Sequence, residues 1–238
     1  MNVLVQDFIQ KNISLAAFTS WQVGGPAQFF CLPKTIDQVQ QAQAWAQTQR
    51  VGVTVIGGGS NVLISDQGVE GLVICLKYLS GVVDSVTVAD CLRLSVLAGT
   101  GKSELLKIFL KQKLSPALFL AGIPGDVGGG VVMNAGVGEA MTPREFVEIT
   151  DWIDVLRPDG HIERLQNNQL QWSYRHMHGW QPGIIVQVGL SWPMHIDEKI
   201  LDKVRDANRV RLSKQPLDMP SCGSVFVNPQ GHKDRKST

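Results

Sequence analysis

The stretch that decides the fold is GIPGDVGGGVVMNAG, Gly122 to Gly136, and its partner is GGGSNVLIS, Gly57 to Ser65. Both are dense in glycine, and they lie far apart in the chain. Glycine lets backbone N–H groups approach a ligand without a Cβ in the way. Successive N–H groups in a tight loop form a concave anion site. The pair therefore suits a long ligand with a diphosphate in its middle, such as a dinucleotide. The alternative is that both segments are only tight turns.

The composition is that of a globular protein with a substantial core. The chain has 238 residues, 44% of them hydrophobic, and a net charge of +1 with acids and bases interspersed. This length allows one large domain or two small ones, and the charge balance does not favour a nucleic-acid surface. Met1 to Gln10 contains Asp7 and does not resemble a secretory signal, and no apolar stretch approaches membrane-spanning length. We expect a cytoplasmic protein with no nucleic-acid or membrane partner.

The cysteines and histidines do not form a metal-binding pattern. None of the cysteines lies in a C-x-x-C pair or at zinc-finger spacing from a histidine. Cys75 lies in an apolar run, which predicts a buried thiol. His176 and His178 are two residues apart, unlike the i, i+4 spacing of a helical metal site. We expect no metal site. The four cysteines are Cys31, Cys75, Cys91 and Cys222.

Capping residues and apolar spacing predict three helices. Thr35 is the expected cap of the first, with Gln38 completing a capping box. Ser103 is the expected cap of the second, and Asp197 of the third. Ile123 to Ala135 is expected to be mostly loop and short strand.

Short apolar runs predict the strands. The two runs that flank Pro158-Asp159-Gly160 predict a hairpin. Short strands mixed irregularly with a few helices indicate an α+β fold and not a regular βαβ repeat. The predicted strands are Val53–Ile56, Leu72–Leu76, Leu92–Ala98, Ile153–Leu156, Ile162–Leu165 and Ile184–Leu190.

Gly99-Thr100-Gly101-Lys102-Ser103 looks like a phosphate-binding P-loop, but it is incomplete. The full pattern needs a glycine five residues before Gly101, and Val96 stands there. A tight turn of left-handed residues, capped by Ser103, explains the segment better. Neither glycine loop matches G-x-G-x-x-G, so a Rossmann domain is not indicated.

Five motifs in order along the chain resemble those of the UDP-N-acetylenolpyruvoylglucosamine reductase (MurB) family. The resemblance runs from about Thr19 to Gly231, nearly the whole chain. The five motifs are FTSWQVGGPA at Phe18 to Ala27, GGGSNVLIS, GIPGDVGGGVVMNAG, SYR at Ser173 to Arg175, and PSCGSVFVNP at Pro220 to Pro229.

The resemblance implies an FAD-binding domain of the vanillyl-alcohol-oxidase (PCMH) type, made of two α+β subdomains. Their expected bounds are 1–71 and 72–214, followed at 215–238 by only the start of a substrate-binding domain. It also implies non-covalent FAD. The sequence agrees, because covalent members of the wider superfamily carry a histidine in or near the first glycine loop, and the five histidines here lie elsewhere.

The resemblance also places the cofactor contacts. The first glycine loop would surround the diphosphate, the second loop would complete that site, and an early loop would line it. The implied FAD contacts are Gly57, Gly58, Gly59, Ser60 and Asn61; Gly122, Ile123, Gly125 and Gly129; and Val23 and Gly24.

The implied reaction uses NADPH to reduce the flavin, which then passes a hydride to the vinyl carbon of an enolpyruvyl UDP-sugar in peptidoglycan synthesis. This chemistry needs a cation over the substrate carboxylate and a proton donor over the neighbouring carbon. Arg175 matches the first role, since a guanidinium grips a carboxylate bidentately. Ser224 matches the second. Tyr174 is expected to pack against or touch the substrate.

The chain departs from the family pattern near its end. The family continues past the GSVF motif into a substrate domain that supplies a late glutamate, whereas this chain ends in HKDRKST. Two hypotheses follow: an active reductase, or an FAD-binding fragment with little or no turnover. A third, an oxidase of the same fold acting on an alcohol or sugar, predicts covalent flavin. A missing domain would expose apolar surface near Val225 and Phe226, so we expect a monomer that self-associates weakly or dissolves poorly.

Overall fold

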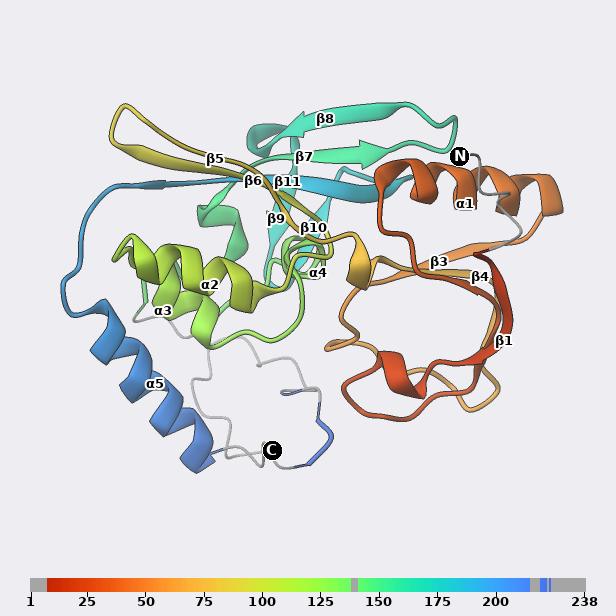
Figure 1. The fold of residues 1–238 in the computed structure, drawn as a ribbon, viewed down its shortest axis with the longest axis horizontal. Coiled ribbons are helices and arrows are strands. Elements are labelled where there is room, and N and C mark those ends of the chain that lie inside the picture. The colour runs from red at the N-terminus through yellow and green to blue at the C-terminus, as the bar shows by residue number, and fades with distance from the viewer. Residues whose placement is uncertain (1–7, 138–140, 215–218, 222, 224–238) are drawn as a thin grey trace.

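The computed structural model describes residues 8–137, 141–214, 219–221 and 223. Two separate sheets, one of four strands and one of five, organise these residues (Figure 1). Helices are mixed irregularly with the strands, which confirms the predicted α+β class. The described helices include none that is long and apolar enough to cross a membrane.

The first sheet is built mainly from parallel strands. Its order is β1-β2-β4-β3, with β4 parallel to both β2 and β3 and with β1 antiparallel to β2. The expected subdomain boundary between residues 71 and 72 falls inside β4, whose pairing partners all belong to this sheet. The strands are β1 (Gln10–Ser14), β2 (Pro26–Cys31), β3 (Val53–Ile56) and β4 (Val69–Cys75).

Helix α1 (Ile36–Gln49) connects β2 to β3 and is also hydrogen-bonded to the second sheet. Its predicted cap is confirmed, since the Thr35 side chain accepts a hydrogen bond from the Gln38 N–H at 3.2 Å. Gln40 and Gln43 donate from their side-chain amides to the carbonyls of Gly160 and Arg157, in the β7–β8 turn, at 3.0 and 2.7 Å. One helix therefore joins the two halves of the fold.

The second sheet is antiparallel throughout, in the order β5-β6-β11-β7-β8. The predicted hairpin around Pro158-Asp159-Gly160 is confirmed as β7–β8. A separate two-stranded ribbon, β9–β10, carries the Ser173 end of the SYR motif. The strands are β5 (Val82–Val88), β6 (Cys91–Leu97), β7 (Thr150–Leu156), β8 (Ile162–Gln166), β9 (Gln171–Ser173), β10 (His176–His178) and β11 (Ile184–Pro193).

The helices and both sheets share one continuous apolar core. It includes Leu72 and Ile74 of β4 together with Val96 of β6 and Val188 of β11. A smaller cluster fills the opposite face of the first sheet, around Phe30. The remaining helices are α2 (Lys102–Lys111), α3 (Pro116–Ala121), α4 (Val127–Val132), α5 (Ile200–Lys214), and the 3-10 turns η2 (Ala16–Phe18), η3 (Leu76–Tyr78), η4 (Phe146–Glu148) and η5 (Asn167–Gln169).

Two local predictions were wrong around the segment that resembles a P-loop, Gly99 to Ser103. Ser103 does not cap α2, because Gly101 is the cap residue and Ser103 lies in the first turn. The turn before α2 is not left-handed either, since none of the described residues 99–101 has a positive φ.

The expected loop and strand at Ile123 to Ala135 contains the helix α4 instead. Three glycines in six residues give this segment poor intrinsic helix propensity, so the sequence pattern pointed away from a helix. Packing stabilises it. A Cβ at Gly130 would lie 2.5 Å from Phe146 Cε2, so glycine lets α4 approach η4 closely.

Cys75 is fully buried, as predicted, and so is Cys31. Burial raises the pKa of the Cys31 thiol to about 12, and it also raises that of Cys75. Both groups are therefore protonated thiols at neutral pH. Cys222 lies outside the described residues.

Candidate functional site

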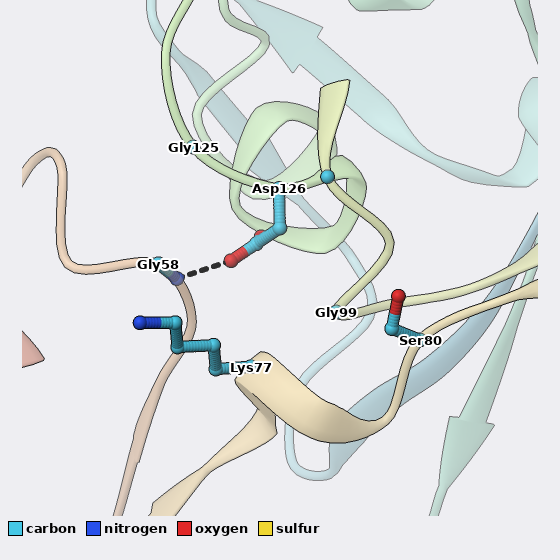
Figure 2. A pocket seen from close by; sticks show the side chains of 7 residues that line it. Gly58, Lys77, Ser80, Gly99, Gly125 and Asp126 are labelled. Carbon is cyan, nitrogen blue, oxygen red and sulfur yellow. Dashed lines mark hydrogen bonds between the residues drawn. The ribbon is translucent and has the colours of Figure 1, made fainter. Parts of the chain in front are cut away.

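The two glycine loops meet at one cavity. Gly58 from the first loop and Gly125 and Asp126 from the second line it, together with Lys77 and Ser80 (Figure 2). Its volume is about 270 Å³. Gly99 and Gly101, from the segment that resembles a P-loop, complete the wall. Four segments that are distant in sequence therefore converge on a small space.

The first loop begins directly after β3 and is held in place by the early loop. The Ser20 N–H donates to the Gly59 carbonyl at 2.9 Å. Gly59 has φ +67°, and a Cβ there would lie 1.9 Å from the Phe18 carbonyl oxygen. Glycine is required at this position by conformation and by contact. The early loop and the first glycine loop are thus tightly coupled.

The early loop also contains Val23 and Gly24, two of the implied cofactor contacts. The Thr19 hydroxyl donates to the Val23 carbonyl at 3.0 Å, which closes this loop on itself. Val23 is 46% exposed, so its side chain is open to contact from outside the protein. Ser60 lies between the loops, because its Oγ would be 2.5 Å from a Cβ on Gly125.

Asp126 links the second loop to the first. Its Oδ1 accepts the Gly129 N–H at 2.7 Å and so caps α4. Its Oδ2 accepts the Gly58 N–H (Figure 2). The residue is only 5% exposed, so a buried carboxylate stands at the point where the loops meet.

Lys102 brings a buried positive charge beneath the same turn. Its Nζ donates to the Pro124 carbonyl at 2.7 Å and lies 5.4 Å from the centre of the Phe146 ring. Burial lowers the pKa of Lys102 to about 8, and the nearby Asp126 carboxylate opposes this shift. Lys102, the lysine of the incomplete P-loop pattern, therefore contacts the second glycine loop from its buried side.

Lys77 adds a positive charge on the cavity side. It belongs to η3, directly after β4, and its side chain extends toward Gly58 in Figure 2. Ser80 follows two residues after this turn and lines the cavity with its hydroxyl. Ammonium, hydroxyl and backbone N–H groups are the donors that a diphosphate needs.

Arg175 lies against the far end of the second glycine stretch. Its guanidinium donates to the Gly136 carbonyl and to the Glu145 carboxylate, both at 3.0 Å. Asn134 donates to the same carboxylate at 3.0 Å and to the Ser173 carbonyl at 3.0 Å. The guanidinium also stacks over the Tyr174 ring, 4.7 Å from its centre. This network fixes Arg175 and leaves it 30% exposed by side chain.

The predicted site residues that the structure describes thus lie on the early loop, on both glycine segments and at Arg175. Gly125 and Gly129 lie at the cavity end of the second glycine stretch, Gly122 and Ile123 follow α3, and Arg175 contacts the other end of that stretch. Tyr174 is 51% exposed. Asn61 is exposed within the first loop. Ser224, Val225 and Phe226 lie outside the described residues.

Sequence reasoning missed four groups at this site. Asp126 was hidden within the glycine-rich run, although aspartate is among the residues preferred at a helix N-cap. Lys77 and Ser80 carry no motif. Glu145 lies outside every motif and is found only through its contact with Arg175.

Comparison with known proteins agrees with the geometry. Residues 27–166 match the family model described as an FAD binding domain. The UDP-N-acetylenolpyruvoylglucosamine reductase of Limosilactobacillus fermentum is 34% identical over 227 residues, covering 94% of this chain and 72% of that protein. That of Synechococcus sp. strain WH7803 is 37% identical, with the same two coverages.

Solved structures give the same picture. The crystal structure of UDP-N-acetylenolpyruvylglucosamine reductase from Thermus caldophilus matches with a TM-score of 0.74 and 27% identity, covering 94% of this chain and 77% of that one. A glucose dehydrogenase, Phl p 4.0202, matches with a TM-score of 0.56 and 17% identity, covering 79% of this chain and 41% of that one. The second likeness concerns the fold alone.

Proposed function

Because the chain belongs to the UDP-N-acetylenolpyruvoylglucosamine reductase family, we propose that it reduces UDP-N-acetylglucosamine enolpyruvate to UDP-N-acetylmuramate. The hydride donor is NADPH, and the reaction serves peptidoglycan precursor synthesis in the cytoplasm. Besides NADPH and FAD, the partner of this function is a small-molecule UDP-sugar. A small monomeric enzyme, with weak self-association at most, suffices for it.

In this proposal the cavity between the glycine loops takes the diphosphate of FAD, which is held non-covalently. Lys77 and Ser80 offer an ammonium and a hydroxyl to this cavity, and Gly58, which also lines it, donates its backbone N–H to Asp126. A Cβ at Gly59 would lie 1.9 Å from the Phe18 carbonyl oxygen, so glycine lets the first loop pack directly against the early loop. Bound FAD supplies the two-electron chemistry that amino-acid side chains lack.

The remaining FAD contacts extend from this cavity along both loops. Gly57, Ser60 and Asn61 continue the first loop, and Gly122, Ile123, Gly125 and Gly129 continue the second. Val23 and Gly24 border the first loop through the hydrogen bond between Ser20 and Gly59. A ligand long enough to reach from this cavity to Arg175 would follow the second glycine stretch.

Arg175 binds the carboxylate of the enolpyruvyl group in this proposal. A guanidinium can bind a carboxylate through two parallel N–H donors, and the Glu145 contact fixes its orientation. Negative charge that develops next to the carboxylate in the transition state is stabilised by a positive group already held in position. Tyr174, stacked on the guanidinium, contacts the same substrate.

Ser224 is the proposed proton donor to the substrate carbon, on the strength of the GSVF motif alone. The substrate-facing part of the protein is proposed to begin at residue 215. The two FAD-binding subdomains are proposed to divide after β4, since that strand pairs only within the first sheet among the described residues.

The observation that carries this proposal is the convergence of both glycine loops on one cavity, with Arg175 at the other end of the second loop. Purified protein supplied with FAD, NADPH and the enolpyruvyl UDP-sugar tests it. We expect mass spectrometry to show a product two hydrogens heavier than the substrate. Bound FAD without product would favour the alternative, an FAD-binding chain with little turnover.

A further inference from the structure

The two carboxylate oxygens of Asp126 serve different segments of the chain. Oδ1 caps α4 through the Gly129 N–H, at 2.7 Å. Oδ2 accepts the Gly58 N–H, which belongs to a loop 68 positions earlier (Figure 2). Helix capping accounts for the first contact. It does not require the second.

The second contact occupies a donor of the proposed cofactor site. Gly58 and Asp126 both line the cavity, and Lys77 and Ser80 face it from η3 and the turn that follows. A carboxylate oxygen and a phosphate oxygen are both anionic acceptors, so they bind the same kind of N–H group. The chain therefore carries an anion of its own where a ligand anion would bind.

We propose that Asp126 competes with the FAD diphosphate for the Gly58 N–H and thereby sets the affinity of this chain for FAD. When FAD binds, Oδ2 leaves Gly58, while Oδ1 keeps its cap on α4. This inference rests on the proposed FAD site between the glycine loops.

The charges around Asp126 determine whether its carboxylate raises or lowers the affinity for FAD. Lys102 holds a buried ammonium on the Pro124 carbonyl beneath the turn, and Lys77 faces the cavity. With Asp126 charged, its carboxylate offsets one of these two positive charges. Without that carboxylate, the Lys77 charge acts on the diphosphate unopposed and the Gly58 N–H is available to it. Asp126 therefore weakens FAD binding through repulsion and through occupation of a donor.

Two substitutions separate the two contacts of Asp126. Asp126→Asn keeps the size and the oxygen that caps α4, but its amide nitrogen cannot accept the Gly58 N–H. Asp126→Ser also keeps a capping oxygen and removes the group that crosses to Gly58. Asp37→Asn is the matched control, because it removes the same charge from an exposed position in the first turn of α1.

The test is calorimetric titration of the full apo chain with FAD, ADP and adenosine. We expect both Asp126 variants to bind FAD and ADP about tenfold tighter or more. We expect unchanged affinity for adenosine, which lacks phosphate, and no effect of Asp37→Asn on any of the three ligands.

Unchanged or weaker FAD binding by the Asp126 variants, with urea midpoints that match the parent chain, would overturn the inference. Equal tightening for ADP and adenosine would overturn it too, because the effect would not lie at the phosphates. If Asp126→Asn does not fold, Asp126→Ser decides. If the parent chain and the Asp126 variants bind FAD with equal affinity, only this inference is contradicted. If none of them binds FAD, the proposed function is contradicted as well.

Discussion

Replacing Gly59 with alanine probes the most constrained position of the first glycine loop. Gly59 has φ +67°, where an L-residue loses about 1–2 kcal/mol relative to its ordinary conformation. The new Cβ would also lie 1.9 Å from the Phe18 carbonyl oxygen and 2.9 Å from Thr19 Cα. Backbone must move to admit it, which costs about 1–3 kcal/mol more.

Together these effects predict a loss of roughly 2–5 kcal/mol in the free energy of unfolding. For a chain of this size the melting temperature falls by roughly 4–20 °C. Gly58→Ala is the matched neighbour, since its Cβ would lie 3.4 Å from both Asp126 Oδ2 and Gly125 Cα, without a positive φ. Gly52→Ala meets nothing within 4 Å. We expect both controls to stay within about 1 kcal/mol of the parent.

Urea unfolding of the apo protein, followed by circular dichroism and tryptophan fluorescence, measures these differences. The chain has six tryptophans to report on it. We expect Gly59→Ala to lower the urea midpoint with an unchanged m-value. A midpoint equal to those of Gly58→Ala and Gly52→Ala would refute the reasoning that the Phe18 contact and the left-handed backbone impose glycine here.

Three further changes test other parts of the account. Because burial lowers the pKa of Lys102 from 10.5 to about 8, the folded chain holds fewer protons than the unfolded chain between these values. Its free energy of unfolding, relative to that of Lys102→Met, should therefore rise by up to about 3 kcal/mol from pH 8 to 10.5, and a constant difference in urea titrations would contradict this. Thr35→Ala should lose about 1 kcal/mol while Thr35→Ser does not, because the Gln38 N–H loses its acceptor; equal melting curves would count against the cap. Glu145→Gln removes the charged partner of Arg175. It should slow reoxidation of the bound flavin by the UDP-sugar about tenfold, without changing FAD affinity or the rate at which NADPH reduces the flavin. Equal slowing of both half-reactions would exclude this positioning role.

The elements that sequence predicts best here are those with local signals. Thr35 followed by Gln38 and an apolar face predicts α1, and the structure confirms it because the cap and the periodicity act within one helix. The hairpin around Pro158-Asp159-Gly160 is also local, since the turn residues themselves favour it. The family motifs add the order of the loops along the chain.

The parts that sequence did not predict depend on contacts between distant segments. VGGGVV has poor helix propensity, yet α4 forms because Gly130 lets it pack against Phe146. Lys102 sits in an incomplete P-loop pattern, but its position under Pro124 follows from the packing of α2 on the second loop. Asp126 likewise meets Gly58 only in the folded chain. No local pattern encodes such pairings.

Anaerobic flavin spectroscopy tests the central claim most directly. The purified protein, loaded with FAD, is first mixed with NADPH and then with the enolpyruvyl UDP-sugar, while the visible flavin absorbance is followed. We predict that NADPH bleaches this absorbance and that the sugar nucleotide promptly restores it. Bleaching without recovery would contradict the claim that this chain reduces the UDP-sugar, and it would leave an FAD-binding protein that accepts electrons from NADPH but does not pass them to that substrate.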